Sequence, residues 1–534
     1  MGKKLSEEEL NNASKEILVA LIMSLQDQLA SMTEQTVLLN QRIDYLSEQI
    51  AAANNYRFGR HTEKLDQIVG QLDFFNEMEL TMDVCGVGEE PKLEEVVTIR
   101  RSNKRKGKRD EDLKDIPAVV TDYTIEPSEL DEKLGHGWKE LPFEVSRQLQ
   151  VKPMEFTVDE QHIHVYASRD GQTMLKADHP KKLIRNSLVS PSVGALILNG
   201  KFVNGMPGNR MVREFEYMGI HVTRQDVARW NIALAERYLA IMYDWLHQRM
   251  YHYHVLHADE TPILVAKDGK PTGSKSWMWV YRTGELHEHP IVLYEYQTGR
   301  SAEHPRNFLK DFSGVLVCDG YQVYHKIGEE KEELQVAGCW VHAKRYFAEA
   351  LKASKGPGKS ATIAGQATER IAEMFHQDNL LKELPPEERL KKRQEIIKPL
   401  VEAYFEWLKS IPGTRKSKTS EGITYSLNQE KYLRKFLEDP YVPMDNNAAE
   451  RAIRPCCIGK KNWYVTDTIS GAKASAIAYS IAETAKANHI RPLKYFEHLL
   501  TEIPKHLEDT DRSFLERLAP WSADLPEECR RILN

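Results

Sequence analysis

The sequence predicts a multidomain α/β protein, and three observations support that class. The chain has 534 residues, more than one ordinary hydrophobic core can organise, so about two to four domains are expected. Its composition, 41% hydrophobic and 28% charged, is typical of globular domains. Between residues 251 and 351, apolar segments with the period of strands alternate with segments of helical period.

Composition also limits the classes of function. The formal net charge of −6 argues against a uniformly basic nucleic-acid binder, although it leaves room for local basic surfaces. No segment approaches the ~18 apolar residues of a membrane span, and the first ten residues lack the apolar core of a signal peptide. We therefore expect a cytoplasmic protein without a membrane partner. The six cysteines are too scattered for a disulfide framework.

The N-terminal region, residues 1–60, carries the clearest periodicity. Its repeating positions step by alternating fours and threes: Leu18, Ile22, Leu25, Leu29, Met32, Thr36, Leu39, Ile43, Leu46, Ile50 and Ala53. Only Thr36 among them is polar, and neither glycine nor proline interrupts the pattern. This heptad seam predicts a coiled coil and, with it, a homo-oligomer. A long helix packed on its own protein is the alternative.

Two less regular segments follow. Residues 61–117 form a linker with a basic arm at Arg100–Arg109, where seven of ten residues are basic. The arm could contact phosphates, or it could be a solvated linker, and the sequence favours neither. Residues 118–180 predict a small β module with strands at Val119–Ile125, Val151–Val158 and His162–Ala167.

Residues 181–250 predict a helical region. One helix begins at Ser190-Pro191-Ser192, a second runs from about Asn209 to Met218 and ends at Gly219, and Thr223 caps a third. A helix, a short glycine turn and a capped helix are typical of helix-turn-helix DNA binding, although an ordinary helical hairpin is at least as compatible with the pattern. The candidate DNA contacts near the start of the third helix are Arg224, Gln225 and Arg229.

Residues 251–504 predict the main α/β domain. Five strands are expected, at His254–Val265, Ser276–Arg282, Ile291–Tyr296, Val315–Cys318 and Leu334–Gly338. Helices are expected at 302–312 and 341–351. Three strands, a helix and then further strands alternating with helices is the order of a ribonuclease-H-like domain.

The rest of the chain is predicted to be mostly helical. Residues 355 to about 440 break the strand–helix rhythm and are interpreted as a helical insertion. After it, Asx residues can cap a helix that opens near Asp445 and whose length Pro455 limits. Helices at 472–486 and 493–500 come next, and residues 505–534 form a C-terminal tail.

Three acids are candidates for chemistry. Asp259 lies inside the apolar strand Val255–Val265, on the face opposite to that of its neighbour Glu260. In a ribonuclease-H-like sheet the first and fourth strands are neighbours, so Asp319, at the end of the fourth strand, could join Asp259. Glu450 lies on a later helix. Two aspartates and a glutamate suit Mg²⁺ or Mn²⁺, and a pair of such ions can activate water or a 3′-hydroxyl against a phosphodiester.

Each acid also has a structural interpretation. Asp259 could cap a strand end, Asp319 with Gly320 could form a turn, and Glu450 could pair with Arg454 four residues on. For any one acid, the structural interpretation explains the residue as well as the functional one does. For all three acids in this topological order, the structural interpretations are the weaker explanation.

Several longer blocks carry a resemblance to a known family. They are His257–Thr261, Val317–Tyr321, Gly338–Arg345, Asp445–Pro455, Lys460–Trp463 and Ser480–Lys486. These blocks resemble the signature blocks of transposases of the insertion sequence 66 family. The resemblance covers nearly the whole chain, including the leucine-rich N-terminal helix and the step Arg57–Gly59.

The resemblance implies a DDE transposase in which Asp259, Asp319 and Glu450 bind two divalent ions for donor-strand cleavage and strand transfer. It also implies recognition of terminal inverted repeats and target DNA, a multimeric DNA complex, accessory proteins of the same element, and a bacterial protein that is nucleoid-associated when bound. Further candidate DNA contacts are His342, Arg451, Arg454, Lys460 and Lys461. A solvated basic face is the alternative for the last four.

One departure concerns zinc. This family usually carries a cysteine-based zinc module between the N-terminal helix and the catalytic domain, but residues 118–180 contain no cysteine. We interpret them as a remnant of that module and expect no zinc. Cys339 and His342 have a ligand-like spacing without a matching second pair, which favours a buried cysteine and a histidine at the edge of the site.

Two alternative functions are compatible with parts of this interpretation. A non-catalytic DNA-binding regulator descended from such an enzyme would act through the coiled coil and the helix-turn-helix. A DNA nuclease without strand transfer would use the same three acids.

Overall fold

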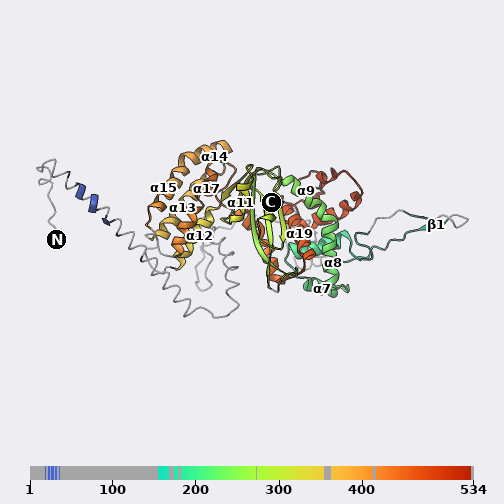
Figure 1. Cartoon of the computed structure of the whole chain (residues 1–534). Helices are drawn as coiled ribbons and strands as arrows, with labels where there is room; N and C mark the ends of the chain where they lie inside the picture. The colour runs from blue at the N-terminus through green and yellow to red at the C-terminus, as the bar shows by residue number, and fades with distance from the viewer. Residues whose placement is uncertain are drawn as a thin grey trace, which may run out of the picture.

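The computed structural model describes scattered positions between Val19 and Arg42, and then residues 154–167, 174–177, 182–271, 273–353, 362–412 and 417–530 (Figure 1). The described positions between Val19 and Arg42 are helical. Most of the predicted heptad seam, the basic arm and the predicted strand Val119–Ile125 lie outside the described residues. None of the described helices is both long enough and apolar enough to span a bilayer.

A short antiparallel hairpin precedes the helical region. Its strands are β1 (Val165–Ala167) and β2 (Met174–Lys176), and Figure 1 draws β1 well away from the main sheet. The predicted strand Val151–Val158 is wrong where the structure describes it, because residues 154–158 form no strand. They pair with no described strand, and all but Phe156 are exposed, so their backbone groups lack the partners that a strand requires.

The helical region begins and ends where the sequence predicts. Its helices are α6 (Pro191–Phe202), α7 (Gly208–Tyr217), α8 (Arg224–Leu234) and α9 (Ala240–Met250), with a π-helical segment, Ala235–Leu239, between the last two. Ser190 caps α6 by accepting the Val193 N–H. Thr223 caps α8 in a reciprocal pair with Asp226. Gly219 adopts a φ of +77°, which allows the turn between α7 and α8.

All five predicted strands are present in one sheet. They are β3 (Val255–Lys267), β4 (Lys275–Thr283), β5 (Val292–Gln297), β6 (Gly314–Cys318) and β7 (Leu334–Gly338). Their order is β5-β4-β3-β6-β7, with antiparallel pairing from β5 to β3 and parallel pairing from β3 to β7. A sixth strand, β8 (Val465–Thr468), runs parallel to the second half of β3. The first and fourth predicted strands are therefore neighbours.

Alternating side chains place a separate core on each face of this sheet. Val255, Val315 and Val317 belong to one core. Leu256 and Leu316 belong to the other, because successive residues of a strand point to opposite faces. Figure 1 shows α12 and the insertion helices on one side of the sheet, and α8, α9 and α19 on the other.

Helices connect these strands and cover the sheet. Those of the strand region are α10 (Glu303–Phe308), α11 (Gln322–Glu330) and α12 (Trp340–Ala353). The predicted insertion is helical where it is described, with α13 (Ile363–Leu380), α14 (Pro386–Lys392), a π-helical segment (Arg393–Ile397), α15 (Lys398–Ser410), α16 (Lys418–Asn428) and α17 (Glu430–Leu433).

The insertion returns the chain to the point where it left the sheet. The Trp340 N–H at the start of α12 donates to the Met444 carbonyl at 2.9 Å. Its indole Nε1 donates to the Leu433 carbonyl at 2.8 Å. Buried Arg393 pairs with Asp378 and donates to the Val442 carbonyl, which holds the end of the insertion in place. The chain therefore re-enters the main domain beside the β7–α12 junction.

The next helix is longer than predicted. α18 spans Asn447–Trp463 and continues through Pro455, so the prediction that this proline limits the helix is wrong. Proline removes one hydrogen bond from the helix, but residues on both sides of it, including Ile453, Cys456 and Cys457, are buried. Their packing holds the helix together across the missing bond.

The C-terminal segment completes the main core. It contains α19 (Ile469–Ala487), α20 (Pro492–Glu502) and α21 (Phe514–Leu518). Leu515, Leu518 and Cys529 are buried, and the Arg491 N–H donates to the Cys529 carbonyl at 2.7 Å. Residues 505–530, assigned to a tail from sequence, therefore pack against α20.

Candidate active site

Asp259 lies in the middle of β3, at the boundary between the two halves of the sheet. In the parallel register, His257 stands beside Val317, so Asp319, two residues beyond Val317, follows the end of β6 at the level of Asp259. One Asp259 oxygen, Oδ1, accepts the Glu260 N–H at 2.8 Å. Burial raises the pKa of Asp259 well above its usual value, and Glu260, Glu450 and Asp319 raise it further by repulsion. The three predicted acids therefore act on one another electrostatically.

Asp319 begins the turn that follows β6. Its Oδ1 accepts the Tyr321 N–H at 2.9 Å. The turn interpretation of Asp319 therefore holds in the structure, and it is compatible with a role in a site because the second carboxylate oxygen, Oδ2, takes no part in that bond.

Glu450 is held near β3 by the residue that precedes α18. Asn446 accepts from His257 Nδ1 at 2.9 Å and donates through Nδ2 to the Ala258 carbonyl at 2.8 Å. Because the amide nitrogen donates to Ala258, the amide oxygen must accept, and His257 carries its proton on Nδ1. Burial lowers the pKa of His257 to about 4, so the ring is neutral. This contact anchors the start of α18 beside Asp259.

The predicted capping of α18 by Asx residues holds for Asp445, whose Oδ1 accepts the N–H of Asn447 at 2.9 Å, but not for Asn446. It occupies the N-cap position but makes no side-chain capping bond. Its amide is engaged by β3, and its backbone N–H donates to Cys339 Sγ at 3.2 Å. The tertiary contacts of this side chain therefore replace the local role that its position predicts.

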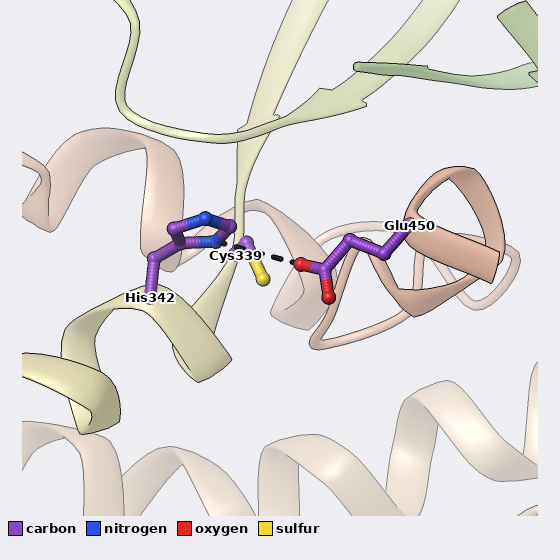
Figure 2. A group of neighbouring side chains, drawn as sticks. All are labelled: Cys339, His342 and Glu450. Atoms are coloured by element: carbon purple, nitrogen blue, oxygen red, sulfur yellow. Dashed lines mark ion pairs between the residues drawn. The ribbon is translucent and has the colours of Figure 1, made fainter. Parts of the chain in front are cut away.

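Glu450 faces a cysteine and a histidine from the β7–α12 junction (Figure 2). Its Oε1 lies 3.9 Å from His342 Nδ1. One ligand atom each from Cys339, His342 and Glu450 lie within 4.8 Å of one another, and this is the one such group of three found among the described residues. Burial alone would lower the pKa of His342, but Cys339, Glu450 and Asp319 together raise it well above its usual value.

Glu450 therefore has a different partner from the one that its sequence suggests. Within the described residues it makes no ion pair with Arg454, and its ion-pair partner is His342. The spacing of Cys339 and His342 was visible in the sequence, but the third donor lies beyond the insertion. Only the return of the chain to the β7–α12 junction brings it close.

Glu260, which sequence reasoning set aside, is central to a second cluster. Its side chain is 1% exposed and forms an ion pair with Arg300, whose Nε donates at 2.8 Å. The hydroxyl of Tyr324 donates to the other carboxylate oxygen at 2.6 Å. The Arg300 guanidinium also lies over the Tyr321 ring, 3.8 Å from its centroid. These contacts connect the segments next to both aspartates and compensate the Glu260 charge.

The predicted cationic DNA contacts fall into two groups. Lys460 donates to Thr261 Oγ1 at 2.9 Å and to the Pro262 carbonyl at 2.8 Å, and Arg451 pairs with Glu285, so both are engaged within the protein. Arg454 is half-buried, His342 has 20% side-chain exposure and Lys461 is exposed. The α8 candidates, Arg224, Gln225 and Arg229, are all exposed, with Arg224 bonded to Asn209 and Arg229 to Asp226.

The carboxylate cluster fits a hard divalent cation by its chemistry. Burial raises the pKa of Asp259, and the neighbouring acids Glu260, Glu450 and Asp319 raise it further by repulsion, which a bound cation would relieve. Oxygen donors of this kind are the ligands that Mg²⁺ and Mn²⁺ prefer. The two aspartates are outside the close group of Cys339, His342 and Glu450.

Comparison with known proteins identifies the family. Residues 186–474 match the model described as "Transposase IS66 family", and residues 480–521 match the "IS66 C-terminal element". Two uncharacterized proteins of Sinorhizobium fredii are similar over most of their length. The protein y4qI is 30% identical over 71% of this chain and 70% of its own. The protein y4hP is 28% identical over 72% of each chain. Because the first family match covers more than half of the sequence, the chain belongs to the IS66 family of transposases.

Proposed function

We propose that this transposase is a DDE-type enzyme that cleaves DNA at the ends of its element and joins those ends to target DNA. In this proposal Asp259, Asp319 and Glu450 bind two Mg²⁺ or Mn²⁺ ions. The observation that carries it is that Asp259 of β3 lies close enough to Glu450 of α18 and to Asp319 at the end of β6 for their charges to add to the rise in its pKa that burial and Glu260 cause. Membership of a transposase family implies that the substrate is DNA.

The strand order supports a ribonuclease-H-like catalytic domain. Three antiparallel strands are followed by two that continue the sheet in parallel from β3, in the order β5-β4-β3-β6-β7. Such an arrangement places the middle of the first strand next to the end of the fourth. Asp259 and Asp319 occupy those two positions, and the anchoring of Asn446 on β3 adds Glu450.

The chemistry divides between the metal and the protein. Bound divalent ions would activate the attacking water or 3′-hydroxyl and stabilise the leaving oxygen. The residues of this chain supply the negative charge that binds such ions and the rigid supports that orient it. Neutral His257 holds Asn446, Asn446 holds the first turn of α18, and the Asp319 turn is closed by its own hydrogen bond to Tyr321.

DNA recognition and assembly use other parts of the chain in this proposal. The exposed residues Arg224, Gln225 and Arg229 at the start of α8 contact terminal inverted repeats, as in a helix-turn-helix. The N-terminal heptad region joins copies of the chain into a homo-oligomer, and accessory proteins of the same element take part. The complex acts at the bacterial nucleoid.

A pair of assays on end-containing DNA tests the proposal. The Asp259→Asn variant should lose Mg²⁺-dependent cleavage, while Asp467→Asn, a matched change at an exposed aspartate of β8, should keep it. Full cleavage by the Asp259 variant would refute the catalytic assignment. Normal biological function in variants of the three acids would instead favour a DNA-binding regulator. Pre-cleaved ends then separate the remaining alternative, because a transposase joins them to target DNA and a nuclease does not.

A further inference from the structure

Glu450 interacts with two groups of different chemistry. Its charge acts on Asp259 of the carboxylate cluster, and its carboxylate forms a close group with Cys339 and His342. We propose that Cys339, His342 and Glu450 form a second metal site, selective for Zn²⁺ or a similar thiophilic divalent ion, and that an ion bound there withholds Glu450 from the carboxylate cluster. The second half of this proposal rests on the proposed function, and the first half does not.

The geometry of the cluster is close to that of a bound ion. Zinc binds cysteine sulfur at ~2.3 Å and histidine or carboxylate atoms at ~2.0–2.2 Å, which places neighbouring ligands of one tetrahedral ion roughly 3.3–3.8 Å apart. The His342 Nδ1 to Glu450 Oε1 distance is 3.9 Å, and all three ligand atoms lie within 4.8 Å of one another. Figure 2 shows the side chains pointing toward one another across the β7–α12 junction.

The unmet polarity of Glu450 is a second, independent indication. Glu450 is 4% exposed, and its Oε1 has no hydrogen-bond partner among the described residues. A buried carboxylate oxygen without a donor is destabilising, and a cation is the partner that best satisfies it. This same oxygen is the one that faces His342.

The surroundings of the cysteine suit a metal-bound thiolate. The Asn446 N–H donates to Cys339 Sγ at 3.2 Å. Backbone donors of this kind stabilise the negative charge of a coordinating sulfur and fix its direction. Because Asn446 also sets the position of α18, the same residue supports the thiolate and the carboxylate of the site.

The ligand types determine which ion each side prefers. A thiolate and an imidazole favour Zn²⁺ strongly over Mg²⁺, whereas a set of carboxylates accepts Mg²⁺ or Mn²⁺. Three protein ligands leave the fourth position of a tetrahedral zinc open to water. Since Glu450 is shared, an ion held by Cys339 and His342 competes with the carboxylate cluster for this side chain.

A cobalt titration of the full-length, metal-free protein tests the site itself. Co²⁺ should produce a thiolate charge-transfer band and the visible bands of a tetrahedral ion, and Zn²⁺ should remove both. The variants Cys339→Ser and His342→Gln should weaken Co²⁺ binding by about 100-fold or more, beyond the roughly 10–100-fold effect of losing a supporting residue. Cys529→Ser, a change at another buried cysteine, is the control and should leave the spectrum unchanged.

Two outcomes would overturn the proposed site. One is a wild-type protein without the thiolate band, and the other is a band that survives in Cys339→Ser and disappears in Cys529→Ser. Circular dichroism of each variant identifies loss of fold. If one of the two ligand variants does not fold, the other decides the result.

An activity measurement tests the consequence for Glu450. Micromolar Zn²⁺ should inhibit Mg²⁺-dependent cleavage by the wild type, and the ratio of activities with and without Zn²⁺ should approach one in Cys339→Ser. Equal inhibition of both proteins would refute the withholding of Glu450. If the wild type cleaves no DNA in any metal, the proposed function fails, while the cobalt spectrum still decides the metal site.

Discussion

Two acids that are adjacent in sequence, Asp259 and Glu260, have opposite environments. Glu260 is paired with Arg300 and accepts from the Tyr324 hydroxyl. Asp259 accepts one backbone hydrogen bond and is otherwise exposed to the charges of Glu260, Glu450 and Asp319. Both side chains are largely buried, so burial alone does not distinguish a structural acid from a functional one.

The difference lies in whether the protein itself supplies the opposite charge. A buried carboxylate that pairs with a cation and accepts a hydrogen bond from a hydroxyl has its charge compensated. Such a carboxylate stabilises the arrangement of the strands and helices that carry these groups. A group of buried carboxylates without a cation is unstable until an ion binds, which is the property of a metal site. Substitutions at the two kinds of acid should therefore have different effects on activity and on stability.

Replacing the uncompensated acid should affect chemistry far more than stability. We expect Asp259→Asn to lower Mg²⁺-dependent cleavage by about 10³-fold or more, equivalent to ~4 kcal/mol of lost transition-state stabilisation. The metal-free protein should be at least as stable as the wild type, because one of several repelling charges is removed. Single-turnover cleavage and urea unfolding measure the two effects. A large loss of metal-free stability would contradict the contrast.

Replacing Glu260, the acid whose charge is compensated, should affect stability more than chemistry. Glu260→Gln leaves Arg300 without its partner, and we expect the free energy of unfolding to fall by about 2–3 kcal/mol. This is below the usual range for a broken buried pair because the Arg300 side chain is 36% exposed. Urea unfolding measures the loss.

A double-mutant cycle supplies the control for that experiment. Arg300→Gln in the Glu260→Gln background should cost less than Arg300→Gln alone, since the two residues stabilise each other. If the two substitutions have additive effects on the free energy of unfolding, the ion pair contributes nothing to stability. Glu260 would then be an uncompensated acid, as Asp259 is.

Glu295 is a buried acid without neighbours of like charge, so it shows the effect of burial separately from the effect of repulsion between acids. Burial raises the pKa of Glu295 on β5 to about 7 from an ordinary value of 4.5. Because the folded state holds its proton more tightly than the unfolded state, the free energy of unfolding should fall as pH rises from about 4.5 to 7 and level off above that. Glu295→Gln should remove about 3 kcal/mol of this dependence. Unfolding from pH 4.5 to 8 measures it, and an unchanged slope would exclude Glu295 as its source.

The smallest effects are expected at exposed cations, where the solvent already compensates the charge. Arg224→Ala with Arg229→Ala should weaken binding to end DNA modestly and reduce the slope of log affinity against log salt by about one to two. Arg306→Ala, at an exposed arginine of α10 that pairs with Glu330, is the control. Equal slopes for all three proteins would exclude α8 from the DNA interface.

Local patterns predicted most of the elements because each depends on neighbouring residues. The strands β3 to β7 follow apolar periodicity, and the starts of α6 and α8 follow from Ser190 and Thr223. The errors have tertiary causes. Pro455 does not end α18, because buried residues on both sides hold the helix, and Asn446 does not cap it, because β3 engages its side chain. Helix α11 went unpredicted, although Tyr324 and Ile327 give it a buried face.

Periodicity and the order of the motifs indicated an α/β sheet with acids at Asp259 and Asp319 and a later acid at Glu450, and the longer blocks indicated the family. The surroundings of those acids follow from the folded chain and not from any local pattern. Folding paired Glu260 with Arg300, and it brought Glu450 back across the insertion to face Cys339 and His342. Periodicity specifies which face a side chain occupies, whereas its electrostatic partners come from segments far away in the chain, and long-range packing and hydrogen bonds place those segments.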